Sequence, residues 1–215
     1  GQSYTYRDFE QLVGGISHQI QAISTQSKQV IAVYATNSIE TYASILAIWF
    51  TGNIYFPVNP QHPASRIANA LHESQASILL TSCETPAELE ASNLPRINTT
   101  QTADNSNFHF VEGELLYMLQ TSGSTGSPKL VPISNQNLSA YAEGYLELHP
   151  KIDTSDCFLQ TYEFTSDAFF SGFVIPLLRG ASIATLNDRL VKPMAVLRAL
   201  TQFQVTWVKM TPSLL

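Results

Sequence analysis

Short strand patterns and amphipathic helix patterns alternate along the first 80 residues of the chain. Apolar residues recur at helical spacing over residues 6–24, 38–50 and 65–73. The other segments are rich in β-branched and aromatic residues, which is typical of buried strands: VIAVYA (30–35), IYFPV (54–58) and SILL (77–80). Because strands that alternate with helices form βαβ units, we predict an α/β fold with mostly parallel sheets flanked by helices.

The second of these helices carries clear signals at both ends. Ser38 precedes it and is a residue type that caps helix N-termini, and Gly52 follows it, as expected at a helix C-terminus. We expect the helix to bury one apolar stripe, formed by Ile39, Tyr42, Leu46 and Phe50.

Residues 84–108 differ in character from the segments around them. They are rich in Glu, Asn, Thr, Ser and Ala and lack clear periodicity, which is typical of an exposed connection. We therefore predict two α/β subdomains, residues 1–110 and 111–215. In the second, we expect strands at 115–119, 131–133, 157–161, 182–186 and 205–210, and helices at 135–148, 169–178 and 192–203.

Charge and composition exclude several classes of function. The chain has 11 Lys+Arg against 17 Asp+Glu, a net charge of −6, so we expect no nucleic-acid partner and no anionic membrane surface. Its longest apolar runs, 42–50 and 169–178, are far shorter than the ~20 residues of a membrane span. Neither the two cysteines nor the five histidines have metal-binding spacing. We expect a cytoplasmic protein without a metal site of its own.

A polar loop, TSGSTGSPK (121–129), follows the strand predicted at 115–119. Its two glycines permit close backbone approach, successive N–H groups can surround an anion, and the hydroxyls and the lysine can contact phosphate oxygens. The loop lacks the Walker A spacing, because Pro128 stands five positions after the first glycine. A flexible surface turn is the alternative interpretation. The candidate phosphate-binding residues are Thr121, Ser122, Gly123, Ser124, Thr125, Gly126 and Lys129.

The segment LQTSGSTGSPKL resembles the phosphate loop of the adenylate-forming superfamily, which comprises acyl-CoA synthetases, luciferases and amino-acid adenylation domains. Gln120 stands where the family usually has an aromatic residue, and Leu130 replaces its usual glycine. Other segments resemble the family in the same order along the chain: Thr5-Tyr6, FTGNIYFPVNP (50–60) with Pro63 and Arg66, and Thr211-Pro212-Ser213.

This resemblance implies the large N-terminal lobe of an enzyme that uses ATP and Mg2+. Such an enzyme joins a carboxylate to AMP, releases pyrophosphate, and passes the acyl group to carrier-protein phosphopantetheine or to CoA. The family's later motifs, including its catalytic lysine, do not occur before Leu215. We therefore expect an incomplete lobe that contains no catalytic residue and is inactive in isolation.

The resemblance also implies a substrate pocket. Asp167 matches the aspartate that binds the substrate ammonium in amino-acid-activating relatives, and Ala168, Ser171 and Lys209 match residues that line the side-chain pocket. A lysine there favours an acidic or amide side chain such as Asp or Asn. The residues themselves leave alternatives open, because Asp167 can be a helix N-terminal residue bonded to backbone N–H groups and Lys209 can point to solvent.

Three functions remain as hypotheses: an amino-acid-activating ligase, a ligase for a fatty or aryl acid and CoA, and a non-catalytic interaction module.

The charged fraction of 13% is about half that of a typical domain. If the lobe is incomplete, part of its surface is core meant for further strands. We expect an exposed apolar face near Trp207 that a second copy of the chain can cover.

Overall fold

The computed structural model describes residues 2–90, 93–102, 108–121, 128–186 and 191–212. The chain forms two compact units, Gly1–Asn135 and Gln136–Leu215. The subdomain division expected near residue 110 lies inside the first unit, because two strands beyond that point join the first sheet.

The first unit is built on a six-stranded sheet with the order β4-β3-β1-β2-β5-β6. Its strands are β1 (Val30–Tyr34), β2 (Ile54–Val58), β3 (Ile78–Thr81), β4 (Arg96–Asn98), β5 (Leu115–Thr121) and β6 (Lys129–Ser134). All neighbouring strands are parallel except β5 and β6, which form an antiparallel hairpin. The predicted fold class, a mostly parallel sheet flanked by helices, is confirmed.

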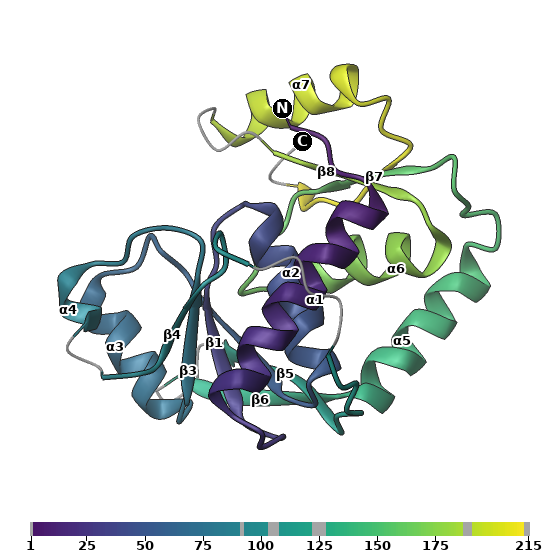
Figure 1. Cartoon of the computed structure of the whole chain (residues 1–215). Helices are drawn as coiled ribbons and strands as arrows, with labels where there is room; N and C mark the ends of the chain where they lie inside the picture. The colour runs from purple at the N-terminus through teal and green to yellow at the C-terminus, as the bar shows by residue number, and fades with distance from the viewer. Residues whose placement is uncertain (1, 91–92, 103–107, 122–127, 187–190, 213–215) are drawn as a thin grey trace. The chain divides into compact units, whose positions relative to one another are not determined.

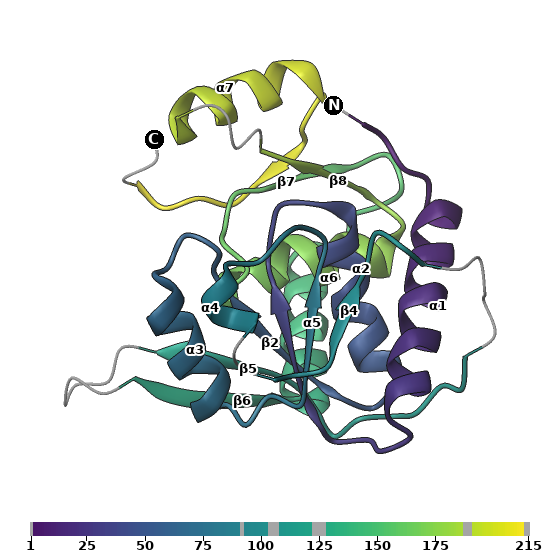
Figure 2. The ribbon, with the colours of Figure 1, turned by 60° about the vertical axis from the view of Figure 1, so that its left-hand side comes forward.

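Helices lie on both faces of this sheet. The described helices of the unit are α1 (Tyr6–Ile23), α2 (Ile39–Phe50), α3 (Ala64–Glu73) and the short α4 (Ala87–Glu90). On one face, Phe56 and Val58 of β2 pack in a buried cluster with Ile67 and Leu71 of α3. On the other, α2 lies against β1 and β2 and is itself covered by α1 (Figures 1 and 2).

This covering corrects the apolar stripe expected on α2. Of the four stripe residues only Tyr42 is buried, whereas Ile39, Leu46 and Phe50 are partly exposed. Because α2 has the sheet on one side and α1 on the other, small residues such as Ser44 and Ala43 are also buried. A stripe is expected only for a helix with one face in water.

The connection at 84–108 contains regular structure that its sequence pattern did not indicate. The short strand β4 pairs with β3, and α4 precedes it. Only Ile97 of β4 is buried, so three residues with one apolar side chain carried no visible periodicity. Pairing with an existing strand edge is what makes this segment a strand.

The second unit has a three-stranded parallel sheet with the order β8-β7-β9. Its elements are α5 (Asn135–Leu148), β7 (Cys157–Gln160), the 3-10 helix η1 (Asp167–Phe170), α6 (Ser171–Arg179), β8 (Ser182–Thr185), α7 (Lys192–Gln202) and β9 (Trp207–Val208). Phe158 of β7 packs with Ile175 of α6 on one face, and Leu159 packs with Val196 of α7 on the other. The helix expected at 169–178 is divided between η1 and α6, and β9 is shorter than expected.

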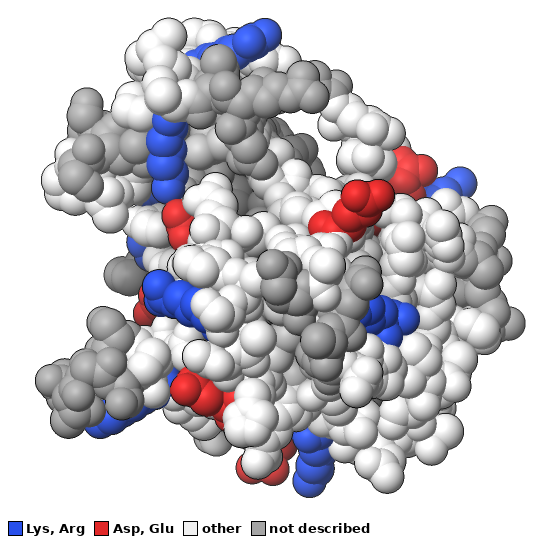
Figure 3. Space-filling view, turned by 90° about the vertical axis from the view of Figure 1, so that its left-hand side faces the viewer, with Lys and Arg blue, Asp and Glu red and all other residues white. Residues whose placement is uncertain are grey.

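Charged side chains are sparse on the surface, as the composition indicates. On the face in Figure 3, blue and red side chains lie in small separated groups among uncharged residues. Among the described helices, none combines the length and apolar character needed to cross a membrane.

The C-terminal end of α2 shows why glycine is needed at position 52. Gly52 has φ +71, a left-handed conformation that favours glycine, which confirms the expected helix end. A Cβ there would lie 2.6 Å from Cγ1 of Val111. Ser38 at the other end is not the expected side-chain cap; its hydroxyl contacts that of Ser82, 3.1 Å away.

We predict that Gly52→Ala lowers the free energy of unfolding by about 2–5 kcal/mol, because it adds left-handed strain to an overpacked contact with Val111. Urea unfolding followed by circular dichroism measures this loss. Gly144→Ala is the control: nothing lies within 4 Å of its added Cβ inside α5, so stability should rise by about 0.5–1 kcal/mol. Equal unfolding midpoints for the two variants would contradict the interpretation.

Candidate functional site

The loop with the phosphate-binding pattern connects β5 and β6. Ser122, Gly123, Ser124, Thr125 and Gly126 lie outside the described residues. The two predicted residues at its ends, Thr121 and Lys129, are paired across the hairpin and exposed. The Thr121 hydroxyl donates to the Lys129 carbonyl over 3.3 Å. The hairpin therefore places one hydroxyl and one cationic side chain at the entrance of the loop.

The two departures from the family pattern lie at the next pair of the same hairpin. Gln120 is paired with Leu130, and its amide donates to the Glu73 carboxylate of α3 over 3.1 Å. Leu130 packs against the apolar cluster between the sheet and α3. Gln120 thus bonds to α3, and Leu130 packs against the cluster between the sheet and that helix.

Asp167 is the first residue of η1, and its side chain is exposed. Its Oδ1 accepts a hydrogen bond from the backbone N–H of Ala168 over 2.8 Å. The cost of a carboxylate in an apolar stretch does not arise here, because η1 turns Phe169 and Phe170 into the core and leaves Asp167 outside. The carboxylate has one local backbone bond and an exposed surface that a substrate cation can approach.

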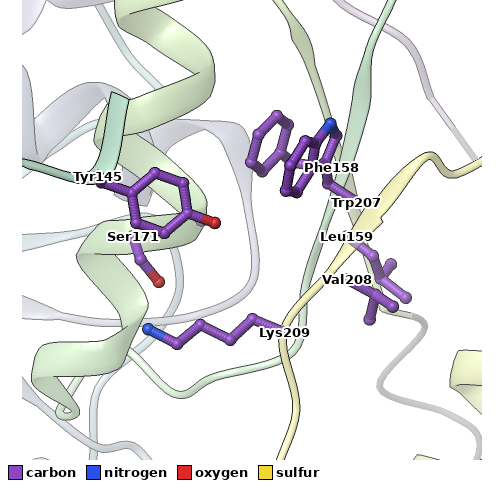
Figure 4. A pocket seen from close by; sticks show the side chains of 8 residues that line it. Tyr145, Phe158, Leu159, Ser171, Trp207, Val208 and Lys209 are labelled. Atoms are coloured by element: carbon purple, nitrogen blue, oxygen red, sulfur yellow. The ribbon is translucent and has the colours of Figure 1, made fainter. Parts of the chain in front are cut away.

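Ser171 and Lys209 line one hollow of the second unit, although 38 positions separate them in the sequence. The hollow is open to solvent, and the space of about 270 Å3 that it borders is not an enclosed cavity. Figure 4 shows Lys209 extending from the end of β9 toward Tyr145 of α5 and Ser171 of α6. Its full lining among the described residues is Tyr145, Phe158, Leu159, Ser171, Gly172, Trp207, Val208 and Lys209. Asp167 and Ala168 belong to the adjoining η1 rather than to this lining.

The three polar side chains of the hollow offer different chemistry. Lys209 is exposed and brings a cation with donors only. The Ser171 hydroxyl donates to the Ala168 carbonyl over 2.7 Å, so its oxygen remains free to accept. Burial, and then repulsion by Tyr141, raises the pKa of Tyr145 above its ordinary value, so its O–H, protonated at neutral pH in any tyrosine, stays a donor here. The hollow can therefore bind a group that presents both an acceptor and a donor.

Tyr145 was missed in the sequence, although a signal for it exists. Tyr141, Tyr145 and His149 recur every four residues along α5 and its end, so they share one side of the helix. Their rings are in contact in series, with centroids 6.0 Å and 4.8 Å apart. This row meets Trp207 through His149, at a centroid distance of 5.0 Å.

Trp207, near which an exposed apolar face was expected, is itself half-buried. Its indole stacks on Phe158 at 5.6 Å with an interplanar angle of 8°. The neighbouring Val208 is 42% exposed. Trp207 therefore forms an apolar wall of the hollow, and self-association through this face stays a prediction.

Other reactive groups are sparse in the part of the chain that is described. There, no group of three or more His, Cys, Asp or Glu side chains is placed to hold a metal ion. Both cysteines are free, and burial raises the pKa of Cys157, which disfavours its thiolate.

Known relatives match nearly the whole chain. It is 29% identical to a component of the linear gramicidin synthase of Brevibacillus parabrevis over 219 residues, which cover 98% of this chain and 3% of that protein. It is 26% identical to tyrocidine synthase 3 of the same organism over 222 residues, with coverages of 100% and 3%. The chain thus spans a small part of the length of these relatives.

Solved structures share its fold. A four-domain nonribosomal peptide synthetase bound to AMP and glycine superposes with a TM-score of 0.84 at 20% identity, over 98% of this chain and 16% of that one. The N-terminal subdomain of Klebsiella oxytoca NpsA, in complex with 3-hydroxybenzoyl-AMSN, gives 0.81 at 22% identity, over 96% and 53%. The family model described as AMP-binding enzyme matches residues 1–215, and the chain therefore belongs to the AMP-binding enzyme family.

Proposed function

We propose that this chain is the N-terminal part of an adenylation domain that activates an amino acid with ATP. An oxygen of the substrate carboxylate attacks the α-phosphorus, the bond from that phosphorus to pyrophosphate breaks, and aminoacyl-AMP forms. The thiol of a carrier-protein phosphopantetheine then attacks the acyl carbon, the bond from that carbon to the AMP phosphate breaks, and AMP is released. The observation that most directly supports this is the meeting of Ser171 and Lys209 at one hollow in a chain of this family.

In this proposal the β5–β6 loop binds the triphosphate. Lys129 supplies a positive charge, and Thr121, Ser122, Ser124 and Thr125 supply hydroxyl donors. Donors placed around the departing pyrophosphate lower the barrier, because they stabilise the negative charge that develops on it. The attachment of Gln120 and Leu130 to α3 and its cluster supports the loop at its base.

The substrate side divides into two positions. Asp167 binds the α-ammonium group, as its exposed carboxylate at the start of η1 permits. Lys209 binds an oxygen of the substrate side chain, and the Ser171 oxygen accepts an N–H. A primary amide offers both groups, whereas a carboxylate offers a stronger attraction to Lys209 alone. The proposed substrate is therefore an amino acid with a small amide or acidic side chain, such as Asn or Asp.

A ligase for an aryl acid is the second candidate, since one matching structure holds a 3-hydroxybenzoyl compound. A substrate of that kind carries no ammonium group, so it would leave Asp167 without a ligand. The two candidates differ in their dependence on Asp167, and the variant described below separates them.

We expect the full-length protein to catalyse amino-acid-dependent exchange of pyrophosphate into ATP. L-Asn and L-Asp should exceed L-Leu and L-Phe by about 100-fold in kcat/KM, since an apolar side chain leaves Lys209 and Ser171 unpaired. Radiolabelled pyrophosphate measures the exchange. Faster exchange with L-Phe or L-Leu would contradict the substrate assignment, and exchange with 3-hydroxybenzoate alone would favour the aryl-acid ligase.

Asp167→Ala should raise the KM for the amino acid by roughly 100-fold, because it removes the charged partner of the ammonium group. The free energy of unfolding should change by less than about 0.5 kcal/mol, since the side chain is exposed. The KM for ATP should stay constant in the same exchange assay. An unchanged KM for the amino acid would show that Asp167 does not bind the substrate.

Lys209→Met should lower kcat/KM for L-Asp by more than for L-Asn, because only the acidic side chain loses a full ionic partner. We expect a decrease of roughly 100-fold for L-Asp and about 10-fold for L-Asn. Lys151→Met is the matched control, since Lys151 is an exposed lysine of the same unit outside the lining of the hollow. Equal effects of the two substitutions would exclude Lys209 from specificity.

A further inference from the structure

Two consecutive polar side chains, Gln160 and Thr161, are buried at the carboxyl end of β7. They are 5% and 4% exposed. Ligands of α/β proteins bind at the carboxyl ends of parallel strands, and β7 is the central strand of its sheet. Buried polar groups need hydrogen-bond partners, so the partners of these two side chains show what they hold.

Gln160 holds η1. Its Nε2 donates to the Phe169 carbonyl over 2.9 Å, and its Oε1 accepts from the backbone N–H of Tyr162 over 3.2 Å. Phe169 lies two residues after Asp167 and two before Ser171. A single buried amide therefore attaches to β7 the segment that carries the proposed ammonium-binding residue and one polar residue of the hollow.

Thr161 bonds to the other side of the hollow, the backbone that carries Lys209. Its hydroxyl donates to the Lys209 carbonyl. The backbone ladder between β7 and β9 ends at the pair Leu159–Val208, so this side-chain bond continues the attachment one residue farther. It orders the backbone from which the Lys209 side chain extends across the hollow (Figure 4).

Gly172 leaves room for the Gln160 amide. A Cβ at position 172 would lie 3.0 Å from Nε2 and 3.2 Å from both Cδ and Oε1 of Gln160. The first turn of α6 thus approaches the amide so closely that only a glycine fits without a shift of that side chain.

We propose that Gln160 and Thr161 are positioning residues that set the distance between the two walls of the substrate hollow. This inference rests on the proposed function. Gln160 acts through η1, and therefore on Asp167 and Ser171, while Thr161 acts through Lys209. Neither residue is part of the lining of the hollow in the described structure.

The test is pyrophosphate exchange by the full-length protein with L-Asn and L-Asp. Thr161→Val removes the hydroxyl in an isosteric side chain, and Thr161→Ser keeps it. We expect Thr161→Val to raise the KM for the amino acid by about 10-fold, with kcat and the KM for ATP nearly constant, and Thr161→Ser to resemble the wild type. In a Lys209→Met background, Thr161→Val should have little further effect, because both changes act on one interaction.

Gln160→Met tests the other wall and should raise the KM for the amino acid by about 10-fold. Gly172→Ala disturbs the same amide without removing it and should act in the same direction. Gly144→Ala is the matched helix glycine and should leave the KM unchanged. If Gln160→Met does not fold, the KM values of Gly172→Ala and Gly144→Ala are compared instead. Circular dichroism checks that each variant is folded.

The outcomes separate the two proposals. Wild-type exchange together with unaltered KM values in Thr161→Val and Gly172→Ala would overturn the positioning role and leave the proposed function standing. If Thr161→Val raised the KM for the amino acid by the same factor in the wild type and in the Lys209→Met background, the positioning role would be overturned as well. Absence of amino-acid-dependent exchange in the wild type would overturn the proposed function, and the positioning role would fail with it.

Discussion

Two polar side chains are buried at the carboxyl end of β7, where water cannot provide hydrogen bonds. Their partners must come from neighbouring segments of the second unit. Gln160 finds its partners in the backbone of Phe169 and Tyr162, and Thr161 finds its partner in the backbone of Lys209. An unpaired amide or hydroxyl there would cost roughly 1–3 kcal/mol. The same hydrogen bonds connect β7 to η1 and to the backbone of Lys209, beyond the strand pairing of β7 with β9.

The first unit meets a comparable requirement at the β5–β6 hairpin. The last described residues of β5 and the first described residues of β6 depend on contacts with neighbouring elements to hold them in place. Gln120 and Leu130 supply those contacts, one through Glu73 and one through the apolar cluster at α3. Both residues that depart from the family pattern thus have contacts of their own in this chain.

The low charged fraction has a visible counterpart in the structure. Uncharged residues cover most of the face shown in Figure 3, and the second unit exposes apolar side chains such as Val208 and Leu197. The charged residues of the candidate site therefore have few other charges around them on this surface. Lys209 and Asp167 are both exposed, and Lys209 lies beside the apolar side chains of Trp207 and Val208.

Much of the architecture follows from the sequence alone, because local patterns determine it. The runs at 30–35 and 54–58 become β1 and β2, and Gly52 ends α2 through a conformation that only glycine adopts easily. The glycine-rich loop, with its flanking strands, identified the family for the same reason: its residues are consecutive. Asp167, Ser171 and Lys209 were candidates through that resemblance, not through any contact visible in the sequence.

Only the tertiary structure decided which distant residues share the same surroundings. It buried α2 on two sides, made β4 a strand by pairing it with β3, and brought Tyr145 of α5 to the same hollow as Lys209, the residue that follows β9. It also assigned partners to Gln160 and Thr161, which in the sequence are two ordinary polar residues after an apolar strand. Periodicity records which side of an element is apolar, whereas hydrogen bonds and contacts between elements depend on how the chain returns to the same place.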